Sequence, residues 1–123
     1  MDLRERICNL VVACLCARWC RLCDAYRATF DAVAARYPQC RFVWIDIEDD
    51  ADLVHAVDVE DFPTVLIGSA QRLRFLGVLT PQAETLDRVL RAALQDALPP
   101  PTHDLSNDEL QALLVALQGR AAE

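Results

Sequence analysis

The segment WCRLC at residues 19–23 most constrains the fold, because of what lies on either side of it. Residues 7–16 form an apolar run rich in Val, Leu and Cys, which is typical of a buried β-strand. After the segment, apolar residues recur at spacings of three and four, as on the buried face of a helix: Tyr26, Phe30, Val33, Ala34 and Tyr37. Cys20 and Cys23 therefore lie where a strand ends and a helix begins.

This position gives the two cysteines a chemical role. Free backbone N–H groups and the positive end of the helix dipole meet at a helix N-terminus, where they stabilise a thiolate. The thiolate is the reactive form of cysteine. Arg18 and Arg21 flank Cys20 and are expected to stabilise the anion further. A pair of cysteines two residues apart can be a redox pair or half of a metal site, and the strand–helix junction favours the redox pair.

Composition limits the classes of protein to consider. The chain has 123 residues, 54% of them hydrophobic and 25% charged, which predicts one globular domain with a core. The net charge of −7 disfavours nucleic acid or an anionic membrane as a partner. No stretch is long enough to cross a membrane. The apolar run at 7–16 leads directly into the CxxC, so we interpret it as a strand, not as part of a signal peptide, and expect a cytoplasmic protein with mostly reduced cysteines.

A second motif lies further along the chain. Phe62, Pro63 and Thr64 precede the apolar residues 65–67, and a turn leads to a second apolar segment at 72–76 that ends at Gly77. A strand, WCxxC and a helix, followed by Pro-Thr before a hairpin, resemble the thioredoxin superfamily over about residues 7–98. The resemblance implies a cis Pro63 opposite the CxxC, and it matches Gly77 to the glycine that ends the second hairpin strand.

The fold implied by this resemblance is an α/β thioredoxin-like fold with a central mixed four-stranded sheet flanked by helices. It would lack most of the usual N-terminal strand–helix unit and carry an extra C-terminal helix. We expect a thioredoxin-like domain at 1–98, a Pro-rich linker at 99–104 and an amphipathic helix at 105–119. Within the first part we predict a strand at 41–47 and a short helix at 50–57, with His55 as a solvent-facing or edge residue of that helix. We also predict a helix opened by Thr80 as N-cap and Pro81 as first helical residue.

The C-terminal helix carries its own start signal and an apolar stripe. Ser106 and Glu109 form a capping box. The stripe must be buried, either on its own domain or on another subunit or partner. Its members are Leu110, Leu113, Leu114 and Leu117.

The mechanism implied by the resemblance is thiol–disulfide exchange. Cys20 would attack a substrate disulfide as thiolate, and Cys23 would then attack Cys20 and release the reduced substrate. No metal or cofactor is called for, and the partners would be protein disulfides and a reductant that the sequence does not identify. The residues expected to support the site or bind substrate are Trp19, Arg21, Leu22, Phe62, Pro63, Thr64 and Gly77.

The chain departs from the family at two positions before the CxxC. Cys14 stands where thioredoxins carry a buried aspartate, and Cys16 where they carry an aromatic residue. We therefore hypothesise slower proton transfer to Cys23, or a different physiological partner. Metal binding by these four cysteines is disfavoured, because Cys14 and Cys16 share one face of a strand while Cys20 and Cys23 lie beyond its end. We interpret Cys8, Cys14, Cys16 and Cys40 as small buried hydrophobic residues, with Cys16 the candidate for a third redox thiol.

Two functions stay open at this point. The first is a thiol–disulfide oxidoreductase that reduces protein disulfides through Cys20 and Cys23. The second is a thioredoxin-fold binding or chaperone/assembly module, in which the CxxC is not catalytic and the C-terminal helix supplies the contact.

Overall fold

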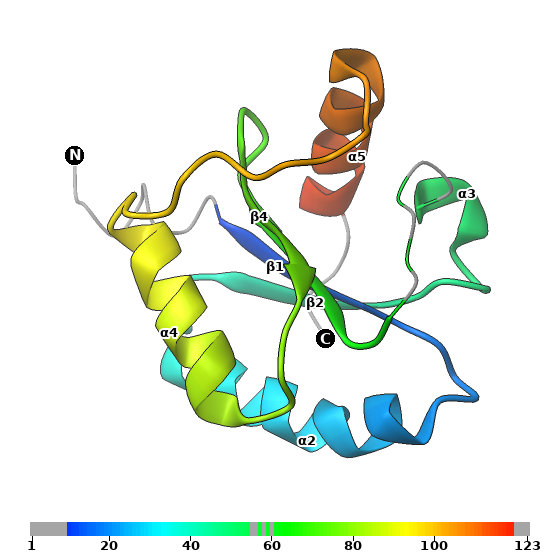
Figure 1. Cartoon of the computed structure of the whole chain (residues 1–123), viewed down its shortest axis with the longest axis vertical. Coiled ribbons are helices and arrows are strands. Elements are labelled where there is room, and N and C mark those ends of the chain that lie inside the picture. Colours follow the sequence, from blue (N-terminus) through cyan, green and yellow to red (C-terminus); the bar gives the residue numbers. More distant parts are fainter. Residues whose placement is uncertain (1–9, 55–56, 58, 60, 120–123) are drawn as a thin grey trace.

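A mixed four-stranded sheet forms the centre of the protein (Figure 1). The computed structural model describes residues 10–54, 57, 59 and 61–119. In this part the strand order is β2-β1-β3-β4, with β1 parallel to β2, and with β3 antiparallel to both β1 and β4. The predicted sheet is confirmed. Its strands are β1 (Val11–Cys16), β2 (Arg41–Asp46), β3 (Thr64–Gly68) and β4 (Leu73–Val78).

Strand β1 is central because all six of its residues are buried. Side chains alternate across a strand, so β1 contributes to both layers of the core. Val12, Cys14 and Cys16 belong to the apolar cluster on one face of the sheet. The intervening residues of β1 belong to the cluster on the other face. The two cysteines of β1 therefore point to the same side.

The face that carries Cys14 and Cys16 is covered by α2 (Arg21–Arg36) and α4 (Ala83–Leu94) (Figure 1). The predicted start of α4 is wrong. Its N-cap is Gln82, which has the extended angles φ −76° and ψ 141°. Two contacts hold the preceding segment: the Leu79 N–H donates to the Pro63 carbonyl, and the Thr80 and Thr85 hydroxyls lie 2.6 Å apart. Because Leu79 is also buried, the chain continues beyond β4 before the helix begins.

The opposite face is covered by α3 (Ala51–Val54) and α5 (Asn107–Gln118). The predicted capping box is confirmed: Ser106 accepts from the Glu109 N–H at 3.1 Å, and Glu109 accepts from the Ser106 N–H at 2.9 Å. The apolar stripe of α5 is buried in the same cluster as Leu15 of β1. Of the two places expected for this stripe, the structure uses its own sheet. The residues of α5 that are buried there are Leu113, Leu114 and Leu117.

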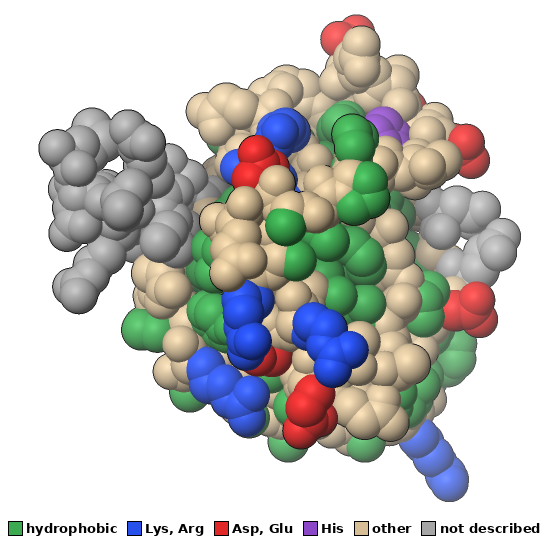
Figure 2. All heavy atoms as spheres, turned by 60° about the vertical axis from the view of Figure 1, so that its left-hand side comes forward, with side chains coloured by type: hydrophobic (Ala, Val, Ile, Leu, Met, Phe, Trp, Pro, Cys, Tyr) green, Lys and Arg blue, Asp and Glu red, His purple; other side chains and the backbone are tan. Residues whose placement is uncertain are grey.

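The side of the protein that α4 covers carries both positively and negatively charged side chains. Figure 2, which brings this side forward, shows basic side chains in blue and carboxylates in red around apolar surface. Asp87 of α4 accepts from Tyr37 at 2.7 Å and pairs with Arg91 at 2.5 Å, and so ties α4 to the end of α2. Arg74 of β4 pairs with Asp96 at 3.3 Å. Each ion pair has one partner that is 62% exposed to solvent, Arg91 or Asp96, so each adds at most about 1 kcal/mol to stability.

Some sequence-based expectations fall outside this description. They concern the strand residues before Leu10, including Cys8, and His55 in the short acidic helix. Among the helices that the structure describes, none combines the length and the apolar character needed to cross a membrane.

Candidate functional site

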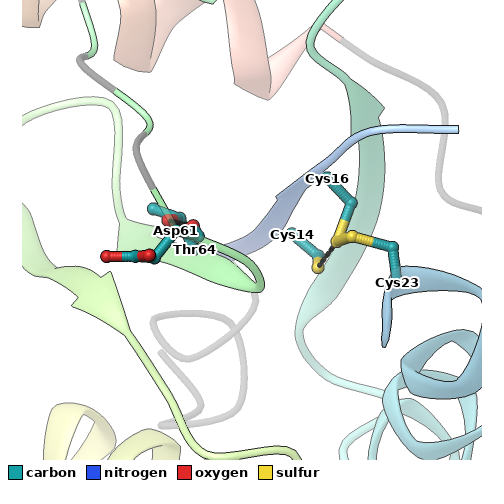
Figure 3. The surroundings of a disulfide bond; sticks show 5 residues. All are labelled: Cys14, Cys16, Cys23, Asp61 and Thr64. Atoms are coloured by element: carbon teal, nitrogen blue, oxygen red, sulfur yellow. Dashed lines mark hydrogen bonds between the residues drawn. A yellow bond between two sulfur atoms is a disulfide. The ribbon is translucent and has the colours of Figure 1, made fainter. Parts of the chain in front are cut away.

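The site is built from four cysteines around the junction between β1 and α2. Cys16 is the last residue of β1, Cys20 is the N-cap of α2, and Cys23 lies in the first turn of that helix. A disulfide joins Cys16 to Cys23 across a Cα–Cα distance of 5.8 Å (Figure 3). The Cys14 Sγ lies 3.6 Å from the Cys16 Sγ. The Cys20 thiol is free. Cys23 is thus bonded to Cys16, which the sequence predicted to be a small buried hydrophobic residue, and not to Cys20, its expected redox partner.

The packing of α2 on β1 explains why Cys16 reaches Cys23. Cys16 points toward α2 because it shares a strand face with Cys14. Cys23 is on the inner side of the first helical turn, with only 1% of its surface exposed. Both residues belong to one buried cluster, which also contains Tyr26 and Phe30 of α2. The junction thus brings a strand cysteine and a helix cysteine face to face inside the core.

Cys20 occupies a different environment from the other three cysteines. It is half-buried and packs against the edge of that cluster. A tight turn positions it, since the Cys20 N–H donates to the Ala17 carbonyl at 3.0 Å. The Cys20 carbonyl in turn accepts from the Asp24 N–H at 3.2 Å, within the first turn of α2. Cys20 is therefore the sulfur of this group that a partner in solution can reach.

A cis peptide bond precedes Pro63, as the resemblance implied. Leu15 of β1 pairs with Thr64 of β3, so Cys16 and Pro63 are the next residues beyond that pair. The Thr64 hydroxyl donates to the Asp61 carbonyl at 2.6 Å and closes this loop (Figure 3). Pro63 is buried. The loop therefore lies beside the end of β1 that carries the disulfide.

Trp19 and Phe62 join this loop to the cysteine segment. Their rings meet edge to face with centroids 5.7 Å apart. The Trp19 indole N–H donates to Glu48 in the loop after β2. Trp19 nevertheless keeps 68% of its surface exposed, and Leu22 keeps 41%. Apolar surface thus surrounds the accessible Cys20 thiol.

The charges near the site are arranged differently from the expectation. Arg18 pairs with Asp49 and lies 4.0 Å from Asp46, so its guanidinium faces the acidic loop after β2. Burial opposes ionisation of Asp46, but N–H donors from Asp49 and Glu48, together with Arg18, hold the pKa of Asp46 below its usual value. The guanidinium of Arg18 therefore pairs with the carboxylates of this loop, Asp46 and Asp49, instead of facing Cys20 alone. Arg21 is exposed at the first helical position.

Two buried groups lie behind the disulfide. Burial raises the pKa of the Cys14 thiol from 9.0 to about 12, and Arg27 offsets only part of this rise. Burial, and then the nearby Cys14, raise the pKa of Tyr26 above its usual value. The Tyr26 hydroxyl has no hydrogen-bond partner among the described residues. Cys14, at the position of the family's buried aspartate, is therefore a protonated thiol at neutral pH.

The raised pKa of Cys14 predicts a dependence of stability on pH. Above pH 9 the unfolded chain loses the Cys14 proton while the folded chain keeps it, so the free energy of unfolding must fall as the pH rises. We expect a fall of about 1 kcal/mol between pH 9 and pH 10. Urea unfolding of the oxidised protein at both values, compared with Cys14→Ala, measures it. Equal pH slopes in the two proteins would contradict the assignment.

Gly77 and the buried Thr64 lie beside a neighbouring hollow. Gly77 pairs with Val65 across β3 and β4, and a Cβ there would come within 3.3 Å of the Phe75 ring. Gly77 and Thr64 line a hollow of about 270 Å³ together with His103 of the segment before α5. Thr64 and Gly77 were predicted for the site, and they line a hollow next to the cysteine cluster that contains none of its cysteines. Among the described residues, no group of three or more His, Cys, Asp and Glu side chains could hold a metal ion.

The bond between Cys16 and Cys23 is the feature that sequence reasoning missed. The signal for it was the alternation of Cys14 and Cys16 on one strand face, directly before a helix that carries a buried cysteine. Together, the mixed sheet, the cis-proline loop and the cysteines at a strand–helix junction define an α/β protein of the thioredoxin-fold class with a thiol–disulfide site.

The thioredoxin family model matches residues 3–90, so this chain belongs to the thioredoxin family, whose general chemistry is thiol–disulfide exchange. A thioredoxin from Ophiophagus hannah is 33% identical over 56 residues, which cover 46% of this chain and 53% of that protein. The putative thioredoxin H10 of Arabidopsis thaliana is 35% identical over 58 residues, which cover 47% of this chain and 38% of that protein. The chain thus spans about half or less of the length of these curated relatives.

Solved thioredoxin structures share the fold. A thioredoxin from Trypanosoma brucei brucei matches with a TM-score of 0.63 and 24% identity, over 71% of this chain and 76% of that one. A thioredoxin from Nicotiana alata matches with a TM-score of 0.63 and 22% identity, over 73% of this chain and 77% of that one. At these identities the likeness supports the fold alone.

Proposed function

We propose that this chain is a disulfide reductase that acts on protein disulfides, with Cys20 as the attacking thiol and Cys23 as the second thiol. The observation that carries the proposal is the half-exposed Cys20 thiol at the N-cap of α2, next to a buried cysteine pair and the cis-Pro63 loop. A helix N-terminus favours an anion, and the exposed thiolate is the species that attacks a disulfide.

The reaction has two exchange steps and starts from the reduced protein. The Cys20 thiolate attacks one sulfur of the substrate disulfide, forms a mixed disulfide and releases the other substrate sulfur as a thiolate. Cys23 then attacks the Cys20 sulfur, which breaks the mixed disulfide and releases the second substrate thiolate. The substrate gains two electrons, and the protein is left with one disulfide. Cys23 suits the second step because it lies one helical turn away and is shielded from solvent.

The apolar surface around Cys20 suits an extended polypeptide substrate. Trp19 and Leu22 are exposed beside it, and the ring of Phe62 packs against Trp19. We propose that these side chains contact residues flanking the substrate disulfide, and that the backbone of Phe62 pairs with the substrate as an added strand. The loop of Pro63 and Thr64 would hold that backbone in place.

The partners we propose are protein disulfides and an electron donor that reduces the protein again after each turnover. Nucleic acid does not belong among them, because the net charge of −7 repels a polyanion. A site that must be returned to the dithiol state fits a reducing compartment, so we propose the cytoplasm as the location.

Insulin reduction tests the function. In dithiothreitol, protein at a concentration well below that of insulin is expected to accelerate cleavage of the insulin disulfides, seen as earlier precipitation of the B chain. A binding module without redox chemistry would leave the rate at that of dithiothreitol alone, which would overturn the proposal. A titration in glutathione buffers then gives the direction, because a reductase must have a potential below that of the glutathione pool.

A further inference from the structure

Three sulfurs form a path from the surface into the core. Cys20 is half-buried at the rim of the cluster, and Cys23 and Cys16 are each 1% exposed and bonded to each other. Cys14, which is fully buried, lies behind this path, with its Sγ 3.6 Å from that of Cys16. Cys23 therefore has two candidate disulfide partners: Cys20, nearer the surface, and Cys16, deeper in the core.

We propose that Cys16 is a third redox cysteine, which takes over the bond to Cys23 after each turnover and sets Cys20 free. The proposal rests on the proposed function, because that reaction produces the Cys20–Cys23 disulfide on which Cys16 acts. The resting oxidised protein is then the state of this structure, with a buried Cys16–Cys23 disulfide (Figure 3) and a free Cys20 thiol.

The step is an internal exchange that needs no further oxidant. The Cys16 thiolate attacks the Cys23 Sγ, a Cys16–Cys23 bond forms, and the Cys20–Cys23 bond breaks. Cys20 leaves as a thiolate and takes up the proton that Cys16 gave up. One disulfide is present before and after the step, so there is no net oxidation. Reversal of the step restores the outer disulfide for reduction.

Burial favours the inner disulfide. A thiolate on Cys16 would be desolvated among Val12, Tyr26 and Phe30, whereas a disulfide is apolar and suits this cluster. Cys20, at the rim, can carry the thiol or thiolate in contact with solvent. The exchange therefore moves the ionisable sulfur outward and the neutral bond inward.

The exchange stops at Cys16, because the structure bonds Cys23 to Cys16 and leaves the Cys14 thiol free. Burial also raises the pKa of the Cys14 thiol to about 12. At neutral pH the Cys14 S–H instead faces the Cys16 sulfur as a weak donor. Cys14 thus positions Cys16 without taking the bond from it.

The consequence is an oxidised protein that conceals its disulfide. A reductant in solution cannot reach sulfurs that are each 1% exposed, so it acts only after Cys20 has taken the bond to Cys23 back. The oxidised protein also keeps a reactive thiol at the surface, where a two-cysteine site would present none.

Trypsin separates the sulfurs for a direct test. Cleavage after Arg6, Arg18, Arg21 and Arg27 places Cys16 in the peptide 7–18, Cys20 in 19–21 and Cys23 in 22–27. The protein is oxidised in glutathione buffer, and its thiols are blocked with N-ethylmaleimide at low pH before digestion. Mass spectrometry should find 22–27 linked to 7–18, with fragmentation placing the bond at Cys16, and 19–21 without a bond to 22–27.

The variants decide between the two proposals. In Cys16→Ala, with Cys16→Ser as a second variant and circular dichroism to check folding, the link must move to 19–21, and labelling of Cys20 must fall by about tenfold or more. Cys40→Ser, at the far end of β2, should give the wild-type map. A link from 22–27 to 19–21 in the oxidised wild type overturns the relay and leaves the reductase intact. A link that stays on 7–18 in Cys16→Ala overturns the assignment to Cys16. Absence of any bond to 22–27 contradicts the reductase itself.

Discussion

Replacement of Cys20 by Ser is expected to lower the rate of insulin reduction by about a hundredfold or more. A serine hydroxyl is not ionised at neutral pH and does not attack a disulfide. The helix N-terminus that carries Cys20 then no longer presents a nucleophile at the surface. The loss should appear in the first exchange step, so no mixed disulfide with the substrate should accumulate.

The remaining cysteines of the site cannot replace Cys20. Cys16 and Cys23 are each 1% exposed, and a protein substrate cannot bring a disulfide within bonding distance of either sulfur. Cys14 lies deeper, and its raised pKa leaves almost no thiolate at neutral pH. Although four cysteines lie close together, the other three therefore cannot act as the attacking thiol in place of Cys20.

The matched control is Cys40→Ser. Cys40 directly precedes β2, at the end of the sheet opposite to the one where Cys16 and Asp46 pair. Its replacement should leave the rate within about twofold of the wild type, because Cys40 lies at the end of the sheet opposite to the one that carries Cys16. Retention of more than about a tenth of the wild-type rate by Cys20→Ser would mean that another residue starts the reaction.

Local sequence patterns predicted most of the fold. The apolar run before residue 16 and the helical spacing after residue 23 placed β1 and α2, because each pattern reports burial on a defined face. The capping box at Ser106 predicted the start of α5, since it depends only on neighbouring residues. The start of α4 was missed because Leu79 is held by Pro63, a contact distant in sequence.

The site was predicted less completely, for a similar reason. The CxxC spacing directs attention to Cys20 and Cys23, whereas the bond in the structure depends on how α2 crosses the end of β1. The orientation of the Arg18 side chain also depends on contacts with residues that are distant in the sequence. Cys20 is only two residues away in the sequence, but the carboxylates of Asp46 and Asp49 are brought beside Arg18 by the parallel pairing of β1 and β2. The spacing of residues along the chain therefore predicts neither the Cys16–Cys23 bond nor the ion pairs of Arg18.

Replacement of Leu114 by Ala is expected to lower the free energy of unfolding by about 2–5 kcal/mol. Leu114 of α5 is 1% exposed and lies in the core cluster that also contains Val11, Ala13 and Leu15 of β1. Its Cδ2 sits so close to Gly68 of β3 that a Cβ on Gly68 would come within 2.9 Å of it. Truncation to Ala would therefore open a cavity between α5 and the centre of the sheet.

Val115 provides the matched control on the same helix. It is 55% exposed, so Val115→Ala should change the free energy of unfolding by no more than about 0.5 kcal/mol. Urea unfolding at low protein concentration, followed by circular dichroism, measures both variants. Low concentration matters because any contribution from association with a second copy is then removed.

The comparison also tests what α5 is for. If α5 existed to bind a partner, its apolar stripe would be free in the isolated chain, and Leu114→Ala would be as mild as Val115→Ala. A large loss for Leu114→Ala alone means that α5 completes the core behind β1, the strand that carries Cys14 and Cys16. In that case removal of the helix would disturb the redox site by loosening β1, and a loss of activity on truncation would not by itself indicate a binding surface.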